Sequence, residues 1–188
     1  MEHTRSEGII LKPDKLKSIE VYADADFAGN WNINTAEHDA SIATSRSGYI
    51  VLYAGCPIIW SSKLQTQVAL STTEVEYVSL SQALREVVPV MNLIKELKDR
   101  KITTISSVSK VYCKVFEDNS GVLELARSLK LRHRTKHINN TYHHFREYVR
   151  NRSIQLFPIG TKFQVADIFT KPLSKDLFVK FRKFIMGL

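Results

Sequence analysis

Residues 48–83 read GYIVLYAGCPIIWSSKLQTQVALSTTEVEYVSLSQA. Two short apolar runs, residues 48–53 and 58–61, flank a turn that contains Gly and Pro, which predicts a β-hairpin. Ser71 followed by Glu74 is a helix start of the capping-box type. This stretch therefore predicts a hairpin that leads directly into a helix.

The rest of the chain extends this pattern in both directions. Apolar residues continue at helical spacing to Leu97, and Pro89 is expected to kink or split that helix. Outside it, short alternating segments predict strands and longer periodic segments predict helices. The expected strands are 19–23, 108–116 and 154–159, and the expected helical segments are 117–127, 138–150 and the region from 165 to the C-terminus. The order of three strands, helix, strand, two helices, strand and helix indicates a mixed α/β domain.

Charge is unevenly distributed along the 188 residues, which suit one domain. The net charge is +8, but residues 1–100 hold 10 Lys and Arg against 13 Asp and Glu, whereas residues 101–188 hold 17 against 6. An acidic half beside a basic half predicts a cation site in one part and a bound polyanion in the other.

Several classes of protein are excluded by composition. No apolar run is long enough to span a bilayer, and the first residues lack the layout of a signal peptide. Cys56 and Cys113 are too few and too far apart for a disulfide framework or a CxxC metal site.

Carboxylates recur where the expected elements meet. Asp24 ends the first strand, Glu74 starts the long helix, Asp118 follows the fourth strand and Asp167 starts the last helical region. Mg²⁺ prefers carboxylate oxygens, so side chains converging on one edge of a sheet could bind it. Taken singly, Glu74, Asp118 and Asp167 are better explained by capping of a helix or by interaction with its dipole. Spacing alone leaves both interpretations open.

Five segments, in order, resemble the successive motifs of the ribonuclease H of copia-type retrotransposons. They are YADADFAG (22–29), SRSGYIVLYAGCPIIWSSKLQTQVALSTTEVEYVSLSQA (45–83), FEDNSGVLELA (116–126), RTKHINNTYHHFREYV (134–149) and VADIFTKPL (165–173). The resemblance covers residues 19–188 as one ribonuclease H domain with a C-terminal helical segment, and leaves residues 1–18 as an N-terminal linker or remnant.

The resemblance implies an α/β, ribonuclease H-like fold, with a five-stranded mixed sheet (three antiparallel strands, then two parallel) flanked by helices. It implies a metal-dependent endonuclease that hydrolyses the RNA strand of RNA–DNA hybrids during reverse transcription, leaving 5′-phosphate and 3′-hydroxyl ends. The alternative is an inactive or domesticated module that grips hybrid for a partner polymerase. The expected partners are the hybrid and the reverse transcriptase domain of the parent polyprotein, with no membrane and no small-molecule cofactor. The expected location is cytoplasmic retroelement particles, with nuclear entry as a second location.

Matching motif to motif, the resemblance implies a catalytic and metal-binding quartet. Its members are Asp24, Glu74, Asp118 and Asp167, which would bind two Mg²⁺ ions, with Mn²⁺ as a substitute. Asp26 competes with Asp24, because side chains two residues apart on a strand point the same way. Glu76 competes with Glu74, but the helical turn sends its side chain elsewhere, so the first of each pair is preferred.

A basic segment is the expected contact with nucleic acid. Its candidates are Arg132, Arg134, Lys136 and His137, which would touch backbone phosphates and carry little sequence information. Asn119 and Ser120, beside Asp118, are further candidates for polar contacts, and helix capping is the alternative role for both. A strand-transfer enzyme of the integrase type is disfavoured, because such enzymes place their glutamate late in the chain.

Overall fold

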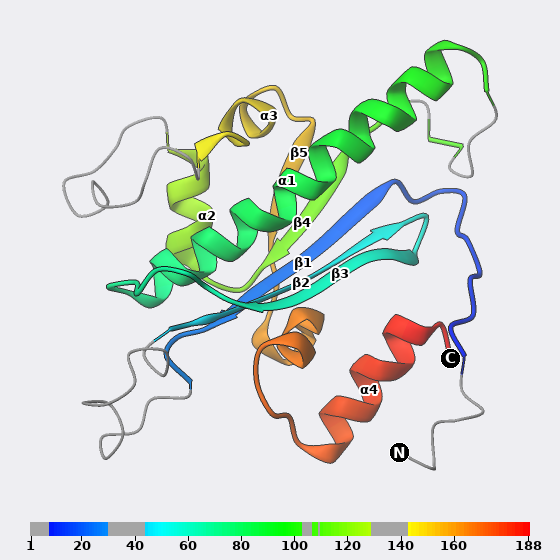
Figure 1. Ribbon diagram of the computed structural model, residues 1–188. Helices are drawn as coiled ribbons and strands as arrows, with labels where there is room; N and C mark the ends of the chain where they lie inside the picture. The colour runs from blue at the N-terminus through cyan, green and yellow to red at the C-terminus, as the bar shows by residue number, and fades with distance from the viewer. Residues whose placement is uncertain (1–7, 30–43, 103–106, 109, 129–142) are drawn as a thin grey trace, which may run out of the picture.

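The structure, a computed structural model, describes residues 8–29, 44–102, 107–108, 110–128 and 143–188. Its centre is a five-stranded sheet with the strand order β3-β2-β1-β4-β5 (Figure 1). The strands are β1 (Ile19–Asp26), β2 (Arg46–Tyr53), β3 (Cys56–Leu64), β4 (Cys113–Glu117) and β5 (Ile154–Pro158). The expected fold class is confirmed.

Antiparallel and parallel pairing meet at β1. β1 pairs with β2 in antiparallel register along its whole length, from Ile19 opposite Tyr53 to Asp26 opposite Arg46. On its other side it pairs in parallel with β4, and this ladder ends at Tyr22 opposite Phe116. β1 and β4 therefore separate at their carboxyl ends, beyond Tyr22 and Phe116. The residues that follow in each strand lie beside the opening between these two strands.

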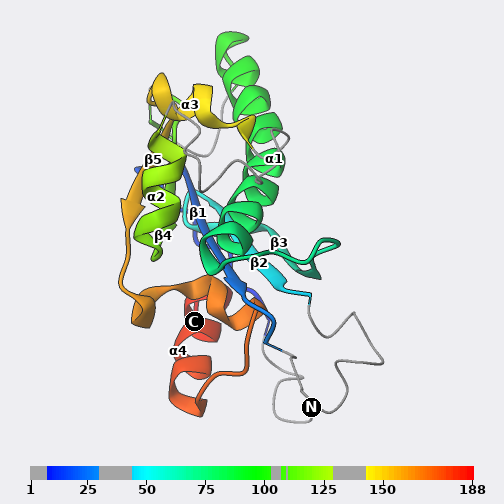
Figure 2. The ribbon, with the colours of Figure 1, turned by 90° about the vertical axis from the view of Figure 1, so that its left-hand side faces the viewer.

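Helices cover both faces of the sheet. The helices are α1 (Thr72–Asp99), α2 (Ser120–Arg127), α3 (Arg146–Arg150) and α4 (Lys175–Met186), with the 3₁₀ turns η5 (Thr161–Phe163) and η6 (Val165–Phe169). α1, α2 and α3 lie on one face, while η6 and α4 lie on the other (Figures 1 and 2). Among the described residues, no helix is both long enough and apolar enough to cross a membrane.

Strand alternation divides the core into two main layers. Val51 packs with Val21 and Leu84 in the cluster beneath α1. Its neighbours Ile50 and Leu52 point the other way and pack against Phe181 of α4. Because successive side chains of a strand alternate between faces, one short segment of β2 serves both layers.

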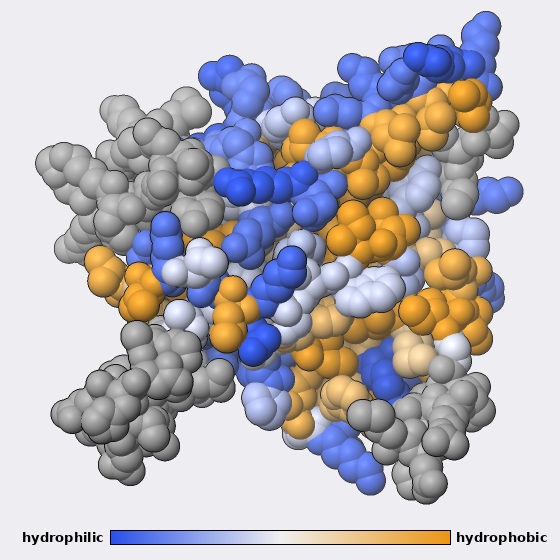
Figure 3. All heavy atoms as spheres, in the orientation of Figure 1, coloured by the Kyte–Doolittle hydropathy of each residue, from blue (hydrophilic) through white to orange (hydrophobic). Residues whose placement is uncertain are grey.

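α1 begins as the sequence predicts. The Ser71 hydroxyl accepts a hydrogen bond from the Glu74 N–H at 3.2 Å, and the Glu74 carboxylate accepts one from the Leu70 N–H at 2.8 Å. The buried side chains of α1, among them Leu80 and Leu84, pack in the core beneath the helix. Over α1, the surface carries both hydrophilic and apolar side chains (Figure 3). Pro89 does not split the helix, which runs unbroken from residue 72 to 99. Pro89 is exposed, so water can replace the lost backbone bond.

The described part of the expected N-terminal linker lies against the domain. The Ile10 N–H donates to the Met186 carbonyl at the end of α4, at 2.8 Å, and the Asp14 N–H donates to the Ala54 carbonyl in the β2–β3 turn, also at 2.8 Å. The domain boundary at residue 18 stays a prediction. Residues 10 and 14 are nevertheless hydrogen-bonded to the end of α4 and to the β2–β3 turn.

Candidate metal centre

Carboxylates gather where β1 and β4 part. Asp24 lies near the carboxyl end of β1, Glu117 and Asp118 lie at the end of β4, and Glu76 comes from the first turns of α1. α1 is fixed over this edge by Ser79, whose hydroxyl donates to the Asp24 carbonyl at 2.7 Å. Parallel strands present their carboxyl ends at one edge of a sheet, and this is the usual place for sites in open α/β sheets.

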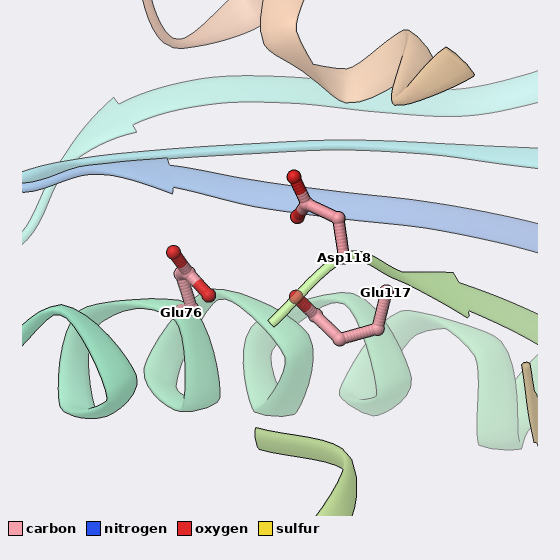
Figure 4. A group of neighbouring side chains, drawn as sticks. All are labelled: Glu76, Glu117 and Asp118. Carbon is pink, nitrogen blue, oxygen red and sulfur yellow. The ribbon is translucent and has the colours of Figure 1, made fainter. Parts of the chain in front are cut away.

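Three of these carboxylates form a compact group, the acidic triad, which consists of Glu76, Glu117 and Asp118. One oxygen from each lies within 4.8 Å of the other two, and the three side chains come from α1 and the end of β4 (Figure 4). Glu117 is fully buried, whereas Glu76 and Asp118 are partly exposed. The Thr161 hydroxyl of η5 donates to Asp118 at 2.9 Å, which ties this loop to the triad.

The triad contains carboxylate oxygens without hydrogen-bond partners. Within the part of the chain that the structure describes, Glu76 Oε2 and Glu117 Oε2 are buried and accept no hydrogen bond. The pKa of Glu76 is raised to about 7, mainly by burial and also by the charges of Asp118 and Asp24. A hydrogen bond from Asn119 acts in the opposite direction and lowers it. Burial, then the neighbouring Glu76, raises the pKa of Glu117 well above its usual range. Hard oxygen donors without partners fit a divalent cation, which would displace the protons that the raised pKa values favour.

A second pair of carboxylates lies beside the triad and is already neutralised in part. Asp24 and Asp167, both almost fully buried, share the ammonium of Lys171, which is 3.0 Å from Asp167 Oδ1 and 3.6 Å from Asp24 Oδ2. The Thr170 hydroxyl hydrogen-bonds to Asp24 as well. Burial, then Asp24, raises the pKa of Asp167 to about 6, while Lys171 opposes that rise. We call Asp24, Asp167 and Lys171 the lysine-bridged pair.

Gln164 holds the segment that carries Asp167. Its buried side chain donates to the Ala23 carbonyl of β1 at 2.9 Å and to the Phe116 carbonyl of β4 at 3.4 Å. Phe116 is the last residue of β4 that pairs with β1, and Ala23 lies one residue beyond the last residue of β1 that pairs with β4. The Gln164 side chain therefore bridges the gap between β1 and β4 and starts η6, in which Asp167 follows three residues later.

Gly48 lets η6 approach the sheet. A Cβ at Gly48 would lie 2.6 Å from Thr170 Cγ2 and 2.8 Å from Phe169 Cβ, both closer than carbon atoms can pack. Gly48 pairs with Asp24 across the β1–β2 ladder. The absence of a side chain there allows Thr170 and Lys171 to reach Asp24.

The structure brings together three of the four predicted quartet residues: Asp24, Asp118 and Asp167. It places Glu76, rather than Glu74, in the acidic triad, because the Glu74 carboxylate turns back to the Leu70 N–H. Glu74 and Glu76 are two positions apart in α1, which places their side chains about 200° apart around the helix axis. Only one of them can therefore face the sheet edge. The preference for Glu74 within this pair is therefore not supported by the geometry.

Other predicted residues are placed differently. Asp26, the competitor of Asp24, is the last residue of β1 and is partly exposed, whereas Asp24 is buried. The Asn119 side-chain oxygen caps α2 by accepting from Gly121 at 2.8 Å and Val122 at 3.3 Å, and Ser120 starts that helix. The basic candidates Arg132, Arg134, Lys136 and His137 lie outside the described residues.

The sequence prediction missed Glu117, Gln164 and Lys171. Glu117 could have been found, because β4 alternates Cys113, Val115 and Glu117 on its buried side. A carboxylate in a buried strand position is a signal in itself. Lys171 follows Asp167 by four residues, but η6 is a 3₁₀ turn, so helical spacing gives no reliable indication of this ion pair.

Solved structures share this architecture. The N-terminal RNase H domain of a Mycobacterium tuberculosis protein, solved as a fusion with maltose-binding protein, matches with a TM-score of 0.54 and 14% identity over 88% of this chain and 96% of that chain. LC11-RNase H1 in complex with an RNA/DNA hybrid matches with a TM-score of 0.50 and 12% identity over 81% of this chain and 94% of that chain. The fold is therefore the ribonuclease H-like fold.

Sequence relatives are more specific. The chain is 35% identical to the Retrovirus-related Pol polyproteins from transposons RE1 and RE2 of Arabidopsis thaliana, over 95% and 96% of its length. No protein-family model matches it. The chain is a homologue of copia-type retrotransposon Pol polyproteins, and it spans 11% of the length of each of these two relatives.

Proposed function

We propose that this chain is a metal-dependent endonuclease that hydrolyses the RNA strand of RNA–DNA hybrids during reverse transcription of a retrotransposon. The observation that carries the proposal is the convergence of Asp24, Glu76, Asp118 and Asp167 on one edge of a ribonuclease H-like sheet. Glu76 takes the place that the sequence comparison of motifs assigned to Glu74. A nuclease of the ribonuclease H type is supported by the fold and by the Pol relatives together.

The residues of the site would have distinct roles in binding the metal ions and in positioning the metal ligands. When bound, two Mg²⁺ ions, or Mn²⁺ in their place, would supply Lewis acidity for hydrolysis of the phosphodiester, which would leave 5′-phosphate and 3′-hydroxyl ends. Asp24, Glu76 and Asp118 would hold the cations at the edge of the sheet. Asp167, carried on η6 and positioned by Gln164, would complete the ligand set. Burial keeps these carboxylates in place before metal arrives, so little reorganisation is needed.

The hybrid is expected to lie across the same edge. Asn119 and Ser120 begin α2 directly beside Asp118, and the basic residues Arg132, Arg134 and Lys136 with His137 would contact phosphates. Recognition would then rest on groove shape and 2′-hydroxyls rather than on base edges. LC11-RNase H1, which shares the fold, is itself solved with an RNA/DNA hybrid. The proposed location is cytoplasmic retroelement particles, with nuclear entry.

The first experiment is cleavage of a labelled RNA–DNA hybrid with Mg²⁺ or Mn²⁺. The wild type is compared with Asp118→Asn, and duplex RNA and duplex DNA serve as substrate controls. Cutting of the RNA strand alone, lost with EDTA and with Asp118→Asn, is the expected result. Tight hybrid binding without cutting in either metal would contradict the proposal.

That second outcome defines the alternative function, an inactive module that grips hybrid for a partner polymerase. One observation favours it: the Lys171 ammonium lies between Asp24 and Asp167, where a cation is expected. The reverse transcriptase domain of a parent polyprotein is the proposed partner, because the matched relatives are Pol polyproteins. Adding that domain would then raise hybrid affinity without producing cleavage.

A further inference from the structure

We propose that Glu117 is a fifth carboxylate ligand of the metal centre, on the triad side, in addition to Asp24, Glu76, Asp118 and Asp167. This inference rests on the proposed function, since it assumes a divalent cation at this edge. It assigns a role to a residue that the quartet does not contain.

The first argument is the position of Glu117. It is the last residue of β4 and is fully buried, on the same side of the strand as Cys113 and Val115. Its backbone is paired with Pro158 of β5, and its carbonyl accepts from the Ile159 N–H at 3.0 Å. The backbone therefore cannot turn the side chain out to solvent without breaking the sheet.

The second argument is the lack of any partner that would justify burial of this carboxylate. Glu117 Oε1 accepts one hydrogen bond, from the Asn119 N–H at 3.2 Å, and Oε2 accepts none within the described ranges. In the described part of the chain, Lys171 forms ion pairs at this edge with Asp24 and Asp167, and no lysine forms one with Glu117. Ionising this buried carboxyl group without a cation is costly, and a divalent cation bound from outside would offset that cost.

The third argument is the direction of the side chain. Glu117 points towards Glu76 and Asp118, with oxygens within 4.8 Å of one another (Figure 4). Oxygens on opposite sides of one Mg²⁺ are about 4.2 Å apart, given Mg–O bonds of about 2.1 Å. Three oxygens on one ion cannot all be opposite one another, and neighbouring ones are about 3.0 Å apart, so the triad would close on Mg²⁺ or Mn²⁺ by side-chain movements of up to about 1 Å. Its three ligands come from two elements that Ser79 and the sheet already hold together.

A shared proton between Glu117 and Glu76 is the competing explanation of the same geometry. It would satisfy one buried oxygen on each side without any metal. The two explanations differ in what happens when Glu117 becomes an amide. A metal ligand loses affinity for the cation, whereas a proton-sharing residue leaves the affinity unchanged because its charge was already absent.

The test is Mn²⁺ binding to the metal-free full chain, measured by electron paramagnetic resonance and calorimetry, without nucleic acid. Glu117→Gln keeps the size of the side chain and an acceptor for the Asn119 N–H. We expect its Mn²⁺ dissociation constant to rise about tenfold or more at the tighter site. Glu96→Gln is the matched control, because Glu96 is exposed and its carboxylate pairs with Arg100, away from the triad. It should bind Mn²⁺ as the wild type does.

Folding of each variant is checked by circular dichroism. If Glu117→Gln does not fold, Glu117→Asp keeps the charge but shortens the reach, and weaker Mn²⁺ binding is again expected. Unchanged Mn²⁺ affinity in a folded variant overturns the inference while hybrid cleavage by the wild type still supports the proposed function. Failure of the wild type to bind Mn²⁺ at all would instead remove the metal centre and both proposals with it.

Discussion

The acidic triad and the lysine-bridged pair lie on the same edge of the sheet but are neutralised in different ways. Asp24 and Asp167 have a cation of their own, Lys171, and a hydroxyl donor in Thr170. Glu76 and Glu117 each have a buried oxygen without a partner in the described chain. The difference indicates that one half of the site is stable without metal, while the other half is completed by it.

This comparison also separates two kinds of residue. The lysine-bridged pair depends on η6, a short 3₁₀ turn that Gln164 and Gly48 seat against the sheet. The triad depends on the end of β4 and the start of α1, which belong to the regular core. We therefore expect changes near η6 to affect stability and Asp167 placement, and changes in the triad to affect metal binding first.

The largest expected effect concerns Glu76 and Glu74. Glu76→Gln should lower the rate of hybrid cleavage by about 10²–10³-fold, because it removes a charged ligand from the triad. Glu74→Gln should change the rate by less than about threefold and lower stability by at most about 1 kcal/mol through the weakened helix cap. Initial rates on a labelled hybrid measure both. Loss of cleavage in Glu74→Gln with normal cleavage in Glu76→Gln would reverse the assignment.

Gln164→Ala should have the largest effect on folding. The Ala23 and Phe116 carbonyls lose a buried donor, at a cost of about 2–3 kcal/mol in the free energy of unfolding measured by urea denaturation. Cleavage should also fall, since Asp167 is no longer held. Gln155→Ala on β5 is the control, because its side chain is only partly buried, and it should cost less than about 1 kcal/mol. Equal losses in the two variants would rule out a special role for Gln164.

The metal-free protein should lose stability as pH rises. The pKa of Glu76 is raised to about 7 and that of Asp167 to about 6, both above their usual values near 4. The folded state therefore binds protons more tightly than the unfolded state, and its extra stability, complete below pH 4, is lost as pH rises through 6 and 7. A melting temperature a few degrees higher at pH 5 than at pH 8, with EDTA present, is the expected result.

Saturating Mg²⁺ should reduce this pH dependence, because a bound cation replaces the protons. Glu76→Gln should flatten it without metal. A melting temperature that rises between pH 5 and pH 8 in EDTA would show that these carboxyls do not govern stability in this range.

The smallest effect is expected from Lys171→Met, which tests the other half of the site. Removing the ammonium leaves the carboxylates of Asp24 and Asp167 without their shared cation. The free energy of unfolding of the metal-free protein should fall by about 1 kcal/mol. The expected loss is small because 35% of the Lys171 side chain is exposed and water screens its charge. Saturating Mg²⁺ should restore most of the loss, and thermal melts with and without Mg²⁺ measure it. If Mg²⁺ restores nothing, Lys171 does not occupy the place of a cation.

Much of the secondary structure could be predicted, because it depends on the local periodicity of apolar and polar residues. The hairpin of β2 and β3, the capped start of α1 and the alternation of β4 all follow from side-chain patterns of period 2 or 3.6. Boundaries were less accurate: the expected strand 108–116 is observed as Cys113–Glu117, and only Arg146–Arg150 of the expected helix 138–150 falls in a described helix. Ends depend on hydrogen-bond partners in other elements, which a local pattern does not contain.

The sequence by itself determined the order of the elements, the mixed α/β class and the placement of Asp24, Asp118 and Asp167 at element ends, because each of these follows from spacing within one segment. Only the tertiary structure decided that Glu76 faces the site while Glu74 caps α1, that buried Glu117 joins Glu76 and Asp118, and that Lys171 bridges Asp24 to Asp167. These contacts join residues from separate elements. The distances between these side chains depend on how β1, β4, α1 and η6 pack together. The spacing of residues along the chain does not specify that packing.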